Sequence, residues 1–474
     1  MVSSVLPGWR AQRRKSGGPA HPFCAGRGRP RPLRLRAVSR QTAMGEGRRR
    51  NSRPAAGRQG VKTILRMPLW ASALAATLIV QTVSSFASLV VPLLGPPLMA
   101  RAGLPPESIG LVSAMTSVGI CWSLACGGPM LGHHGPVRTL QIGLACMVAG
   151  LFVLSQPLGL LGLLGALAIG FGLGPNTPAG SQILIRTAPP RHRTLIFSIK
   201  QAGVPLGGAL AGLVVAPLVL RHGLPATLGV VIGVILLTIL LVQPFRRRLD
   251  EDRGTGHPGW ARALVSPAAM LGSVGVLRAH PSLPMLTALG ASFSMMQSCL
   301  TAFTATYAVT RHGASLAEAG LIVALMQGAS MVGRIVMGWV ADRTGHAMRL
   351  LVLQAGASAL AVGLLVVAGG HGAWALYGCA ALAGLTAIGW NGVHIAELAR
   401  VAPLHQVSDV TSAASLFGFI GSIFGPLLFT LVVHWSGSYG LAFLLMAAQL
   451  AAFGLVSAAF LWRGAGRRAG GGAG

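Results

Sequence analysis

Twelve long apolar runs dominate this chain and leave few folds open to it. A bilayer core of about 30 Å is crossed by about 20 apolar residues in helical form, and only helices or closed barrels satisfy the backbone inside lipid. Six runs lie in the first half, at 68–92, 109–131, 139–156, 158–184, 195–219 and 224–243. Six more lie in the second half, at 284–309, 319–340, 350–369, 373–396, 410–434 and 438–462. The pattern predicts an all-α membrane protein with twelve transmembrane helices.

The composition fits a membrane protein but carries a large positive charge. The chain is 53% hydrophobic and 10% charged, with a mean hydropathy of +0.65 and a net charge of +29. Such a charge can indicate a nucleic-acid partner, so its distribution matters. Seventeen of the 38 Lys and Arg residues lie in residues 1–66, opposed there by Glu46 alone. More than half of the excess therefore belongs to the leader, and we expect no nucleic-acid partner.

Residues 1–66 form a basic leader that we expect to be disordered, because it is rich in Arg, Pro and Gly and has no apolar periodicity. Three interpretations are open. The leader is an organelle transit peptide, a polybasic segment that contacts anionic lipid or nucleic acid, or an extension of the gene model beyond a true start at Met44 or Met67. We favour the last, because Met67 stands directly before the first apolar run.

Loop charge predicts the orientation of the chain. With both termini in the cytoplasm, the inner loops and the tail hold sixteen arginines, and the outer loops hold three, Arg101, Arg221 and Arg311. We therefore expect a multi-pass protein of the plasma (inner) membrane. The longest internal polar stretch separates six runs from six. The predicted parts are the leader 1–66, a first half 67–243, a cytoplasmic linker 244–283, a second half 284–462 and a tail 463–474.

The two halves repeat each other at an offset of about 210 residues. The stretch RAGLPPESIG at 101–110 is similar to RHGASLAEAG at 311–320, and GPMLGHHG at 128–135 stands where GWVADRTG stands at 338–345. Later, Gly-Pro-Asn at 174–176 pairs with Gly-Trp-Asn at 389–391. Because six is even, both halves cross the membrane in the same direction and are related by an axis along its normal.

The predicted loop between the second and third helices of the second half carries the motif Gly338-x-x-x-Asp342-Arg343-x-Gly345, followed by Arg349. The motif resembles the signature loop of the major facilitator superfamily. With the twelve runs and the repeat, the resemblance covers residues 67–462. It implies two pseudo-symmetric six-helix halves. The first half departs from the family pattern, because Gly132 stands where the acid is expected.

The resemblance implies a gating role for this loop. In the family, its charges hold one conformation of the carrier closed at the cytoplasmic side, which implies that role for Asp342, Arg343 and Arg349. Physically, Asp342 can cap exposed amides of a neighbouring helix or pair with a cation, and Gly345 permits backbone angles that other residues resist. The alternative is that these are ordinary loop charges of the cytoplasmic side.

Two cations fall within apolar runs. Arg334 precedes Asp342 by eight residues, which places it about 12 Å deeper along the helix. A cation at that depth is costly unless it faces a cavity or a partner, so it is a candidate for solute binding. Gln327 lies two turns earlier on the same face, and Lys200 begins the fifth predicted helix. The alternative is that both cations extend their head groups to the inner surface.

In the family, the first, fourth, seventh and tenth helices line the central cavity. By that resemblance the candidate lining residues are Gln81, Asn176, Gln297, Trp390 and Asn391. Buried amides also serve as contacts between helices, so that interpretation stays open. His394 and Glu397 follow Asn391 at intervals of three residues, and His394 could relay a proton. A packed histidine without such a role is the alternative.

No phosphate-binding loop, catalytic triad motif or metal-ligand spacing occurs in the sequence, so we expect neither an enzyme nor a cofactor. We expect a monomeric secondary transporter that works by alternating access. Two buried cations and no acid in the first six runs favour an organic anion such as a carboxylate, with Arg334 as its clamp. Coupling to a proton or a counter-anion stays open. The alternatives are proton-coupled efflux of amphiphilic drugs and a non-transporting membrane sensor or regulator.

Overall fold

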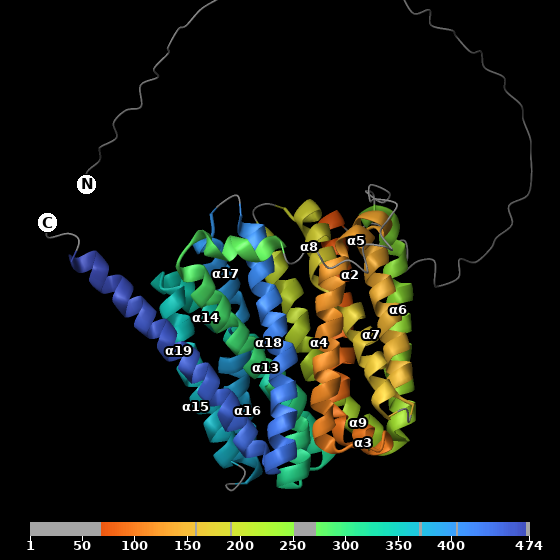
Figure 1. The fold of residues 1–474 in the computed structure, drawn as a ribbon. Helices are drawn as coiled ribbons and strands as arrows, with labels where there is room; N and C mark the ends of the chain where they lie inside the picture. The colour runs from red at the N-terminus through yellow and green to blue at the C-terminus, as the bar shows by residue number, and fades with distance from the viewer. Residues whose placement is uncertain are drawn as a thin grey trace, which may run out of the picture. The chain divides into compact units, whose positions relative to one another are not determined.

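The computed structural model describes residues 68–156, 159–189, 192–250, 272–368, 372–403 and 406–470, and these residues are almost entirely helical (Figure 1). The predictions for the leader 1–66 lie outside the described residues, as do those for most of the linker and the end of the tail. The helices follow the apolar runs because a helix satisfies its own backbone where no water is present.

The first half has the fourth predicted run divided between two helices and the fifth and sixth runs in one long helical element. Its elements are α2 (Leu69–Leu93), α3 (Gly95–Arg101), η1 (Pro106–Ser108), α4 (Ile109–Cys126), α5 (Gly128–His134), α6 (Pro136–Leu154), η2 (Gly159–Gly162), α7 (Leu163–Leu173), α8 (Asn176–Thr187), α9 (Arg193–Val242), η4 (Gln243–Phe245) and α10 (Arg246–Leu249). The long α9 contains two predicted runs, and the chain turns between them at Gly223, whose φ of 78° suits glycine.

The second half has a similar order. Its elements are η5 (Gly272–Ala279), α13 (Ser282–His312), α14 (Leu316–Thr344), α15 (Ala347–Ala368), α16 (Ala373–Ala383), the π-helical turn η6 (Gly384–Ile388), α17 (Asn391–Val401), α18 (Val407–Ser436) and α19 (Tyr439–Gly470). The start of α14 carries a reciprocal cap. There, Ser315 Oγ accepts from the Glu318 amide at 3.2 Å, and Glu318 Oε2 accepts from the Ser315 amide at 2.8 Å.

Ten helices in the described residues are long and apolar enough to cross a membrane. One of them, Ile196–Leu249, contains two of the predicted runs, so the ten account for eleven. The remaining run, 284–309, forms α13, a helix of 31 residues that is not among the ten. Multiple membrane crossings are therefore supported, whereas the total of twelve stays a prediction.

The contacts follow the repeat. In the first half α2 packs along α9, and in the second half α13 packs along α18. Between the halves, α9 packs against α14 and α4 against α18. Figure 1 shows α5, α8 and α17 at one end of the helices, which we call the linker end, and α3 at the opposite, far end. Among the described elements, α5, α8 and α17 pack extensively only within their own halves.

The halves meet toward the far end. Thr430 Oγ1 donates to the Glu107 carbonyl at 3.0 Å, and His434 Nδ1 lies 4.0 Å from Glu107 Oε1. A Cβ added at Gly212 would lie 2.3 Å from the carbonyl oxygen of Gly320, so the backbones of α9 and α14 approach closely there. The two halves are thus joined at the far end, while the linker-end segments separate into two groups.

Candidate functional site

Two repeat-related helices are interrupted in mid-course. The fourth crossing breaks between α7 and α8, at Gly174 and Pro175, and the tenth passes through the η6 turn before α17. The new helices begin at Asn176 and Asn391. Irregular backbone at membrane depth is tolerated where it is buried in protein or lines a cavity, and π-helical turns are frequent at functional sites. These two breaks are therefore candidate positions for a solute site.

Lys200 lies at the break in the fourth crossing. Its side chain is 2% exposed, and Nζ donates to the Asn176 carbonyl and to Gln201 Oε1, both at 3.2 Å. Gly180 makes room for it, because a Cβ there would lie 2.9 Å from Lys200 Cε. The side chain points inward between α8 and α9, not toward a surface. Within the described part of the chain it forms no ion pair.

Arg334 lies beside the break in the tenth crossing. A Cβ at Gly389 would be 3.2 Å from the Arg334 amide nitrogen, so the backbones of the two helices touch there. The Arg334 side chain is half-buried, and its Nε is buried with no hydrogen-bond partner among the described residues. Exposed apolar residues such as Ile335 and Trp339 mark the lipid-facing side of α14, which leaves Arg334 on the inner side.

The two cations lie at similar depth on facing helices. The Gln327 amide of α14 lies against α9, where a Cβ at Gly208 would be 2.4 Å from Nε2. On α9, Lys200 lies eight residues from Gly208 toward the linker end, which is about 12 Å. On α14, Arg334 lies seven residues from Gln327 in the same direction, which is about 10 Å. Each half thus places one cation at an interrupted helix, although the two belong to helices that the repeat does not pair.

The remaining candidates fall into two groups. In the first half, Gln81 is buried and donates to Ser85 Oγ at 3.4 Å, whereas Gln81 Oε1 and Asn176 Nδ2 are buried without a partner in the described residues. In the second half, Trp390 Nε1 donates to Gln297 Oε1 at 2.9 Å. These groups are polar, inward and close to the breaks, as a solute site requires.

An aromatic stack adjoins the second group. The Trp390 ring lies parallel to Phe293, with centroids 5.2 Å apart, and edge-on to His394 at 5.1 Å. Phe293 was not singled out from the sequence, since one more Phe in an apolar run gives no signal. Asn391, half-buried, begins the next helix. The stack is buried, with Phe293 0% and Trp390 4% exposed, so in this conformation it packs the helices together beside these polar groups.

The predicted proton relay is divided between separate partners. His394 Nε2 lies 2.9 Å from the Leu286 carbonyl, and Glu397 pairs with Arg400 at 2.6 Å. No hydrogen bond among the described residues joins His394 to Glu397. A relay through this pair stays a hypothesis.

The motif loop is exposed at the linker end. Gly345 ends α14 with φ 65°, in the left-handed region, and its neighbours Asp342, Arg343 and Arg349 are exposed. The Arg343 guanidinium stacks over Trp339 at 4.9 Å. Asp342 makes no hydrogen bond or ion pair with any described residue. Gly338 is half-buried one turn earlier. The gating pair that the sequence predicts is not formed in this conformation.

In the first half, the loop that corresponds to the motif loop is capped by a carboxylate from a later part of the chain. Asp250, just past the last residue of the sixth crossing, accepts from the amides of Val137 at 2.7 Å and Arg138 at 3.2 Å at the start of α6. Gly135, with φ 83°, leaves space for it. Burial raises the pKa of Asp250, and these bonds together with Arg246 only partly offset that effect. Sequence reasoning missed this residue because it lies in the predicted linker.

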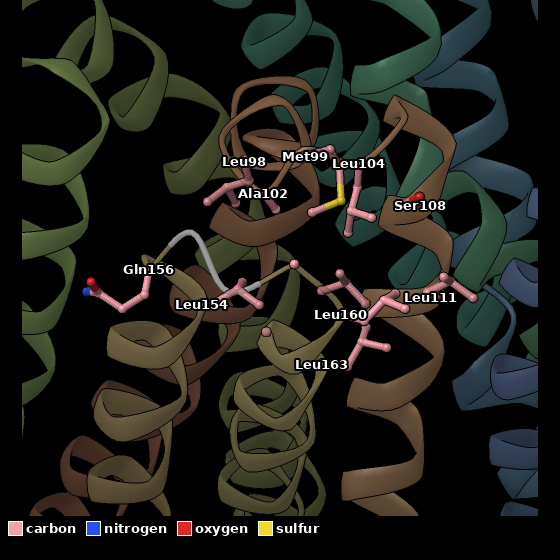
Figure 2. Close-up of a pocket in the computed structure, with 13 residues that line it drawn as sticks. Leu98, Met99, Ala102, Leu104, Ser108, Leu111, Leu154, Gln156, Leu160 and Leu163 are labelled. Carbon is pink, nitrogen blue, oxygen red and sulfur yellow. The ribbon is translucent and has the colours of Figure 1, made fainter.

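A small apolar pocket at the far end is not a solute site. Figure 2 shows it between the α3 region and the end of α6, lined mainly by leucines, together with Met99, Ser108 and Gln156. It encloses about 20 Å³, enough for a water-sized molecule only. The interrupted helices remain the candidate site.

Comparison with known proteins decides the family. Residues 74–426 match the family model of the Major Facilitator Superfamily. The chain belongs to this superfamily. The curated relatives that it matches are named as transporters, and the chain is a multi-pass integral membrane protein.

Several curated relatives are similar over part of their length. An uncharacterized MFS-type transporter of Mycobacterium tuberculosis is 28% identical over 58% of this chain and 60% of its own length. The 4-hydroxybenzoate transporter PcaK of Pseudomonas aeruginosa is 27% identical over 57% of this chain and 66% of its own. A gallate transporter of Pseudomonas putida is 26% identical over 58% and 68%. The chain thus spans about 60% of the first relatives that it matches.

Solved structures share the fold at low identity. A peptide transporter, POT, crystallised in complex with sulfate, superposes with a TM-score of 0.67 at 16% identity, over 82% of this chain and 94% of that one. A bacterial homologue of the human lysosomal transporter Spinster gives 0.63 at 16% identity, over 83% and 96%. At these identities the likeness shows the fold alone.

Proposed function

We propose that this protein carries a small organic anion, of the carboxylate class, across the membrane by alternating access. The observation that supports this most is the pair of cations, Lys200 and Arg334, at similar depth on the two helices that face each other across the halves. Neither has an acidic partner among the described residues. A buried cation without a counter-charge is costly, and an anionic solute between the two would offset that cost.

Each cation suits a carboxylate in its own way. The planar guanidinium of Arg334 can present two parallel N–H groups to a carboxylate, and its Nε has no other partner in the described chain. Lys200 is a point charge fixed at the start of α8, where the positive end of the helix dipole also favours an anion. Gln81, Asn176 and Gln327 would complete the polar side of the site.

The relatives that transport 4-hydroxybenzoate and gallate support a carboxylate with an aromatic ring. In this chain the Phe293–Trp390 stack lies next to Gln297 but is buried, so an aromatic ring of a solute would reach it only in a conformation that opens the helices there. We therefore choose 4-hydroxybenzoate as the first test solute.

We infer that the linker end faces the cytoplasm of a plasma (inner) membrane, with both termini inside, because sixteen loop and tail arginines lie on that side in the predicted topology. In the described conformation the halves meet toward the far end, so rocking them would close the linker end and open the other. One chain supplies both halves of the site, which supports a monomer. Exchange against a counter-anion or symport with a proton would both fit.

The test is solute counterflow in proteoliposomes of phosphatidylcholine. Vesicles loaded with unlabelled 4-hydroxybenzoate should accumulate the labelled anion transiently, whereas loading with uncharged 4-hydroxybenzamide should give no counterflow. Equal counterflow of the two compounds would reject recognition by charge. Efflux of a lipophilic cation in the same vesicles, with no counterflow of 4-hydroxybenzoate, would favour the drug exporter instead. Imposed pH gradients then separate proton symport from exchange.

A further inference from the structure

An ion pair joins the two halves at the far end. Glu107 of η1 belongs to the first half, and its Oε1 lies 4.0 Å from His434 Nδ1 of α18 in the second half. Beside this pair, Thr430 Oγ1 donates to the Glu107 carbonyl at 3.0 Å. The ion pairs of Asp250 and Glu397 each stay within one half. The Glu107–His434 pair is therefore placed to act between the halves.

The helices around the pair pack closely. Thr430 and His434 lie four residues apart, so they share the face of α18 that meets the first half. On α4, a Cβ added at Gly110 would lie 2.7 Å from the carbonyl oxygen of Pro426, a backbone atom that cannot turn aside. The far end is thus closed by backbone contact between α4 and α18. If the halves rock, this contact opens and Glu107 leaves His434.

A protonated His434 attracts the first half. Imidazole is the side-chain group whose charge changes between pH 5 and pH 8. The Glu107 carboxylate faces it, and His434 lies in the last turn of α18, where the negative end of the helix dipole also attracts a cation. The His434 side chain is 67% exposed, so it exchanges protons with the medium. The charge that holds the pair together therefore depends on the pH of the medium at the far end.

The other ionisable groups near the pair have contacts of their own. Arg311, at the end of α13, donates to the carbonyl at the C-cap of α18 and stays charged at all these pH values. His312 lies edge-on to an aromatic ring of its own helix. Tyr439, at the start of α19, is buried and carries no charge near neutral pH. Glu318 caps its own helix, and α4 has no charged residue. His434 is therefore the titrating group that faces the acid of the other half.

The repeat-related contact between the halves lacks such a pair. Gly110 corresponds to Gly320, which meets Gly212 where α14 packs against α9. At the same offset of 210 residues, Ala317 stands in place of Glu107. The two contacts share their glycine, whereas the acid is present in one of them only. Close packing of the halves does not require the acid, so the pair has a separate effect.

We propose that the Glu107–His434 pair is a proton-sensitive latch of the far end. When His434 is protonated, its attraction to Glu107 favours the conformation in which the far end is closed. As the pH rises and the imidazole loses its proton, this attraction is lost and the far end opens more readily. The inference rests on the alternating access of the proposed function. It adds regulation by the pH at the far end, which the predicted topology places outside the cell.

The latch is measured as the population of the open far end. In a chain whose six cysteines are replaced by alanine, Leu160→Cys and Trp374→Cys place one spin label on each half, both at exposed far-end positions. Double electron–electron resonance in phosphatidylcholine nanodiscs gives the ratio of the long, open distance to the short, closed one. An exposed ion pair shifts an equilibrium by about twofold to fivefold, so the ratio should rise by that factor between pH 5.5 and pH 8.5.

Matched variants assign the change to the pair. His434→Gln should hold the ratio near the parent value of pH 8.5 throughout, and His434→Arg, a permanent cation, should hold it near the value of pH 5.5. Glu107→Gln should also remove the dependence on pH. His222→Gln, which removes another exposed histidine of the far end, should keep the parent response. A parent ratio that does not change with pH, or a response that persists in His434→Gln, would overturn the inference.

Counterflow of 4-hydroxybenzoate distinguishes this inference from the proposed function. If the solute is carried and the pH response depends on His434, both stand. If the response depends on His434 but 4-hydroxybenzoate is not carried, the latch stands and the choice of solute is wrong. If 4-hydroxybenzoate is carried while His434→Gln keeps the full pH response, the latch inference fails alone.

Discussion

The Gln327 amide of the second half lies against Gly208 of the first, at the level where α9 and α14 meet. Both helices extend from this contact toward the linker end, and each carries one cation at similar depth. The contact therefore fixes the relative height of Lys200 and Arg334. If the halves rock about the far-end contacts, these two side chains approach each other as the linker end closes.

The close approach of α9 and α14 should be sensitive to a single methyl group. A Cβ at Gly212 would lie 2.3 Å from the Gly320 carbonyl and 2.7 Å from the Ala324 amide, both backbone atoms that cannot turn aside. We expect Gly212→Ala to lower the counterflow rate about tenfold, because the halves can no longer meet. Gly233→Ala, which meets no atom within 4 Å, is the control. Equal rates for the two variants would show that this contact does not limit transport.

Lys200→Met should separate transport from stability. Met has a similar length and no charge, so it removes the desolvation cost of a cation that is 2% exposed. We expect the melting temperature to stay the same or rise while counterflow falls about tenfold or more. Thermal unfolding in detergent and counterflow would be measured on the same preparation. Retained transport at wild-type rate would mean that Lys200 is only a packing residue.

Asp250 should make stability depend on pH. Burial raises its pKa above the usual 3.8, so the folded state favours the protonated form. Stability from this group is then full below the unfolded pKa and is lost as the pH rises from about 4 through the raised folded value. Asp250→Asn keeps an acceptor for the Val137 amide and should flatten this dependence. Asp250→Ala loses the cap and should cost about 1 kcal/mol at every pH.

To test this, the melting temperature would be measured between pH 4 and pH 8 for the wild type, Asp250→Asn and Asp250→Ala. If the wild-type melting temperature instead rises with pH more steeply than that of Asp250→Asn, the pKa of Asp250 is not raised in the folded state.

Asp342 should matter for turnover and not for folding. It is exposed and unpaired in the described conformation, so Asp342→Asn removes nothing that stabilises this state. If it pairs only when the linker end closes, counterflow should fall about fivefold or more with unchanged melting temperature and yield. A parallel loss of folded protein and transport would instead give Asp342 a structural role.

Much of the fold follows from local pattern. Apolar length predicts the crossings, and the repeat predicts two halves with the same order of helices, of which α9–α14 and α4–α18 are equivalent contacts in the structure. Gly345 illustrates a residue whose conformation the motif predicts, because a helix that ends in a sharp turn needs a residue that tolerates φ 65°. These features are determined by residues that are close in the sequence, so the sequence alone is enough to predict them.

The candidate site depends on contacts between residues that are far apart in the sequence, and the sequence alone does not show which residues meet. Nothing near Lys200 in sequence shows that its ammonium group reaches Asn176, 24 residues earlier. Asp250 meets Val137 across 113 residues, and its place in a polar stretch suggests only a linker. The candidate set for the site came from residue type and the family resemblance, so it included Glu397, which the structure pairs with Arg400.

The proposed function depends most on Arg334, which we propose binds the charge of the solute. Counterflow of labelled 4-hydroxybenzoate should be compared between the wild type, Arg334→Gln and Arg221→Gln, an exposed arginine at the far end. We expect Arg334→Gln to lower the ratio of the maximal rate to the half-saturating concentration by about tenfold to a hundredfold, whereas Arg221→Gln should stay close to wild type. Wild-type counterflow by a folded Arg334→Gln protein would contradict it.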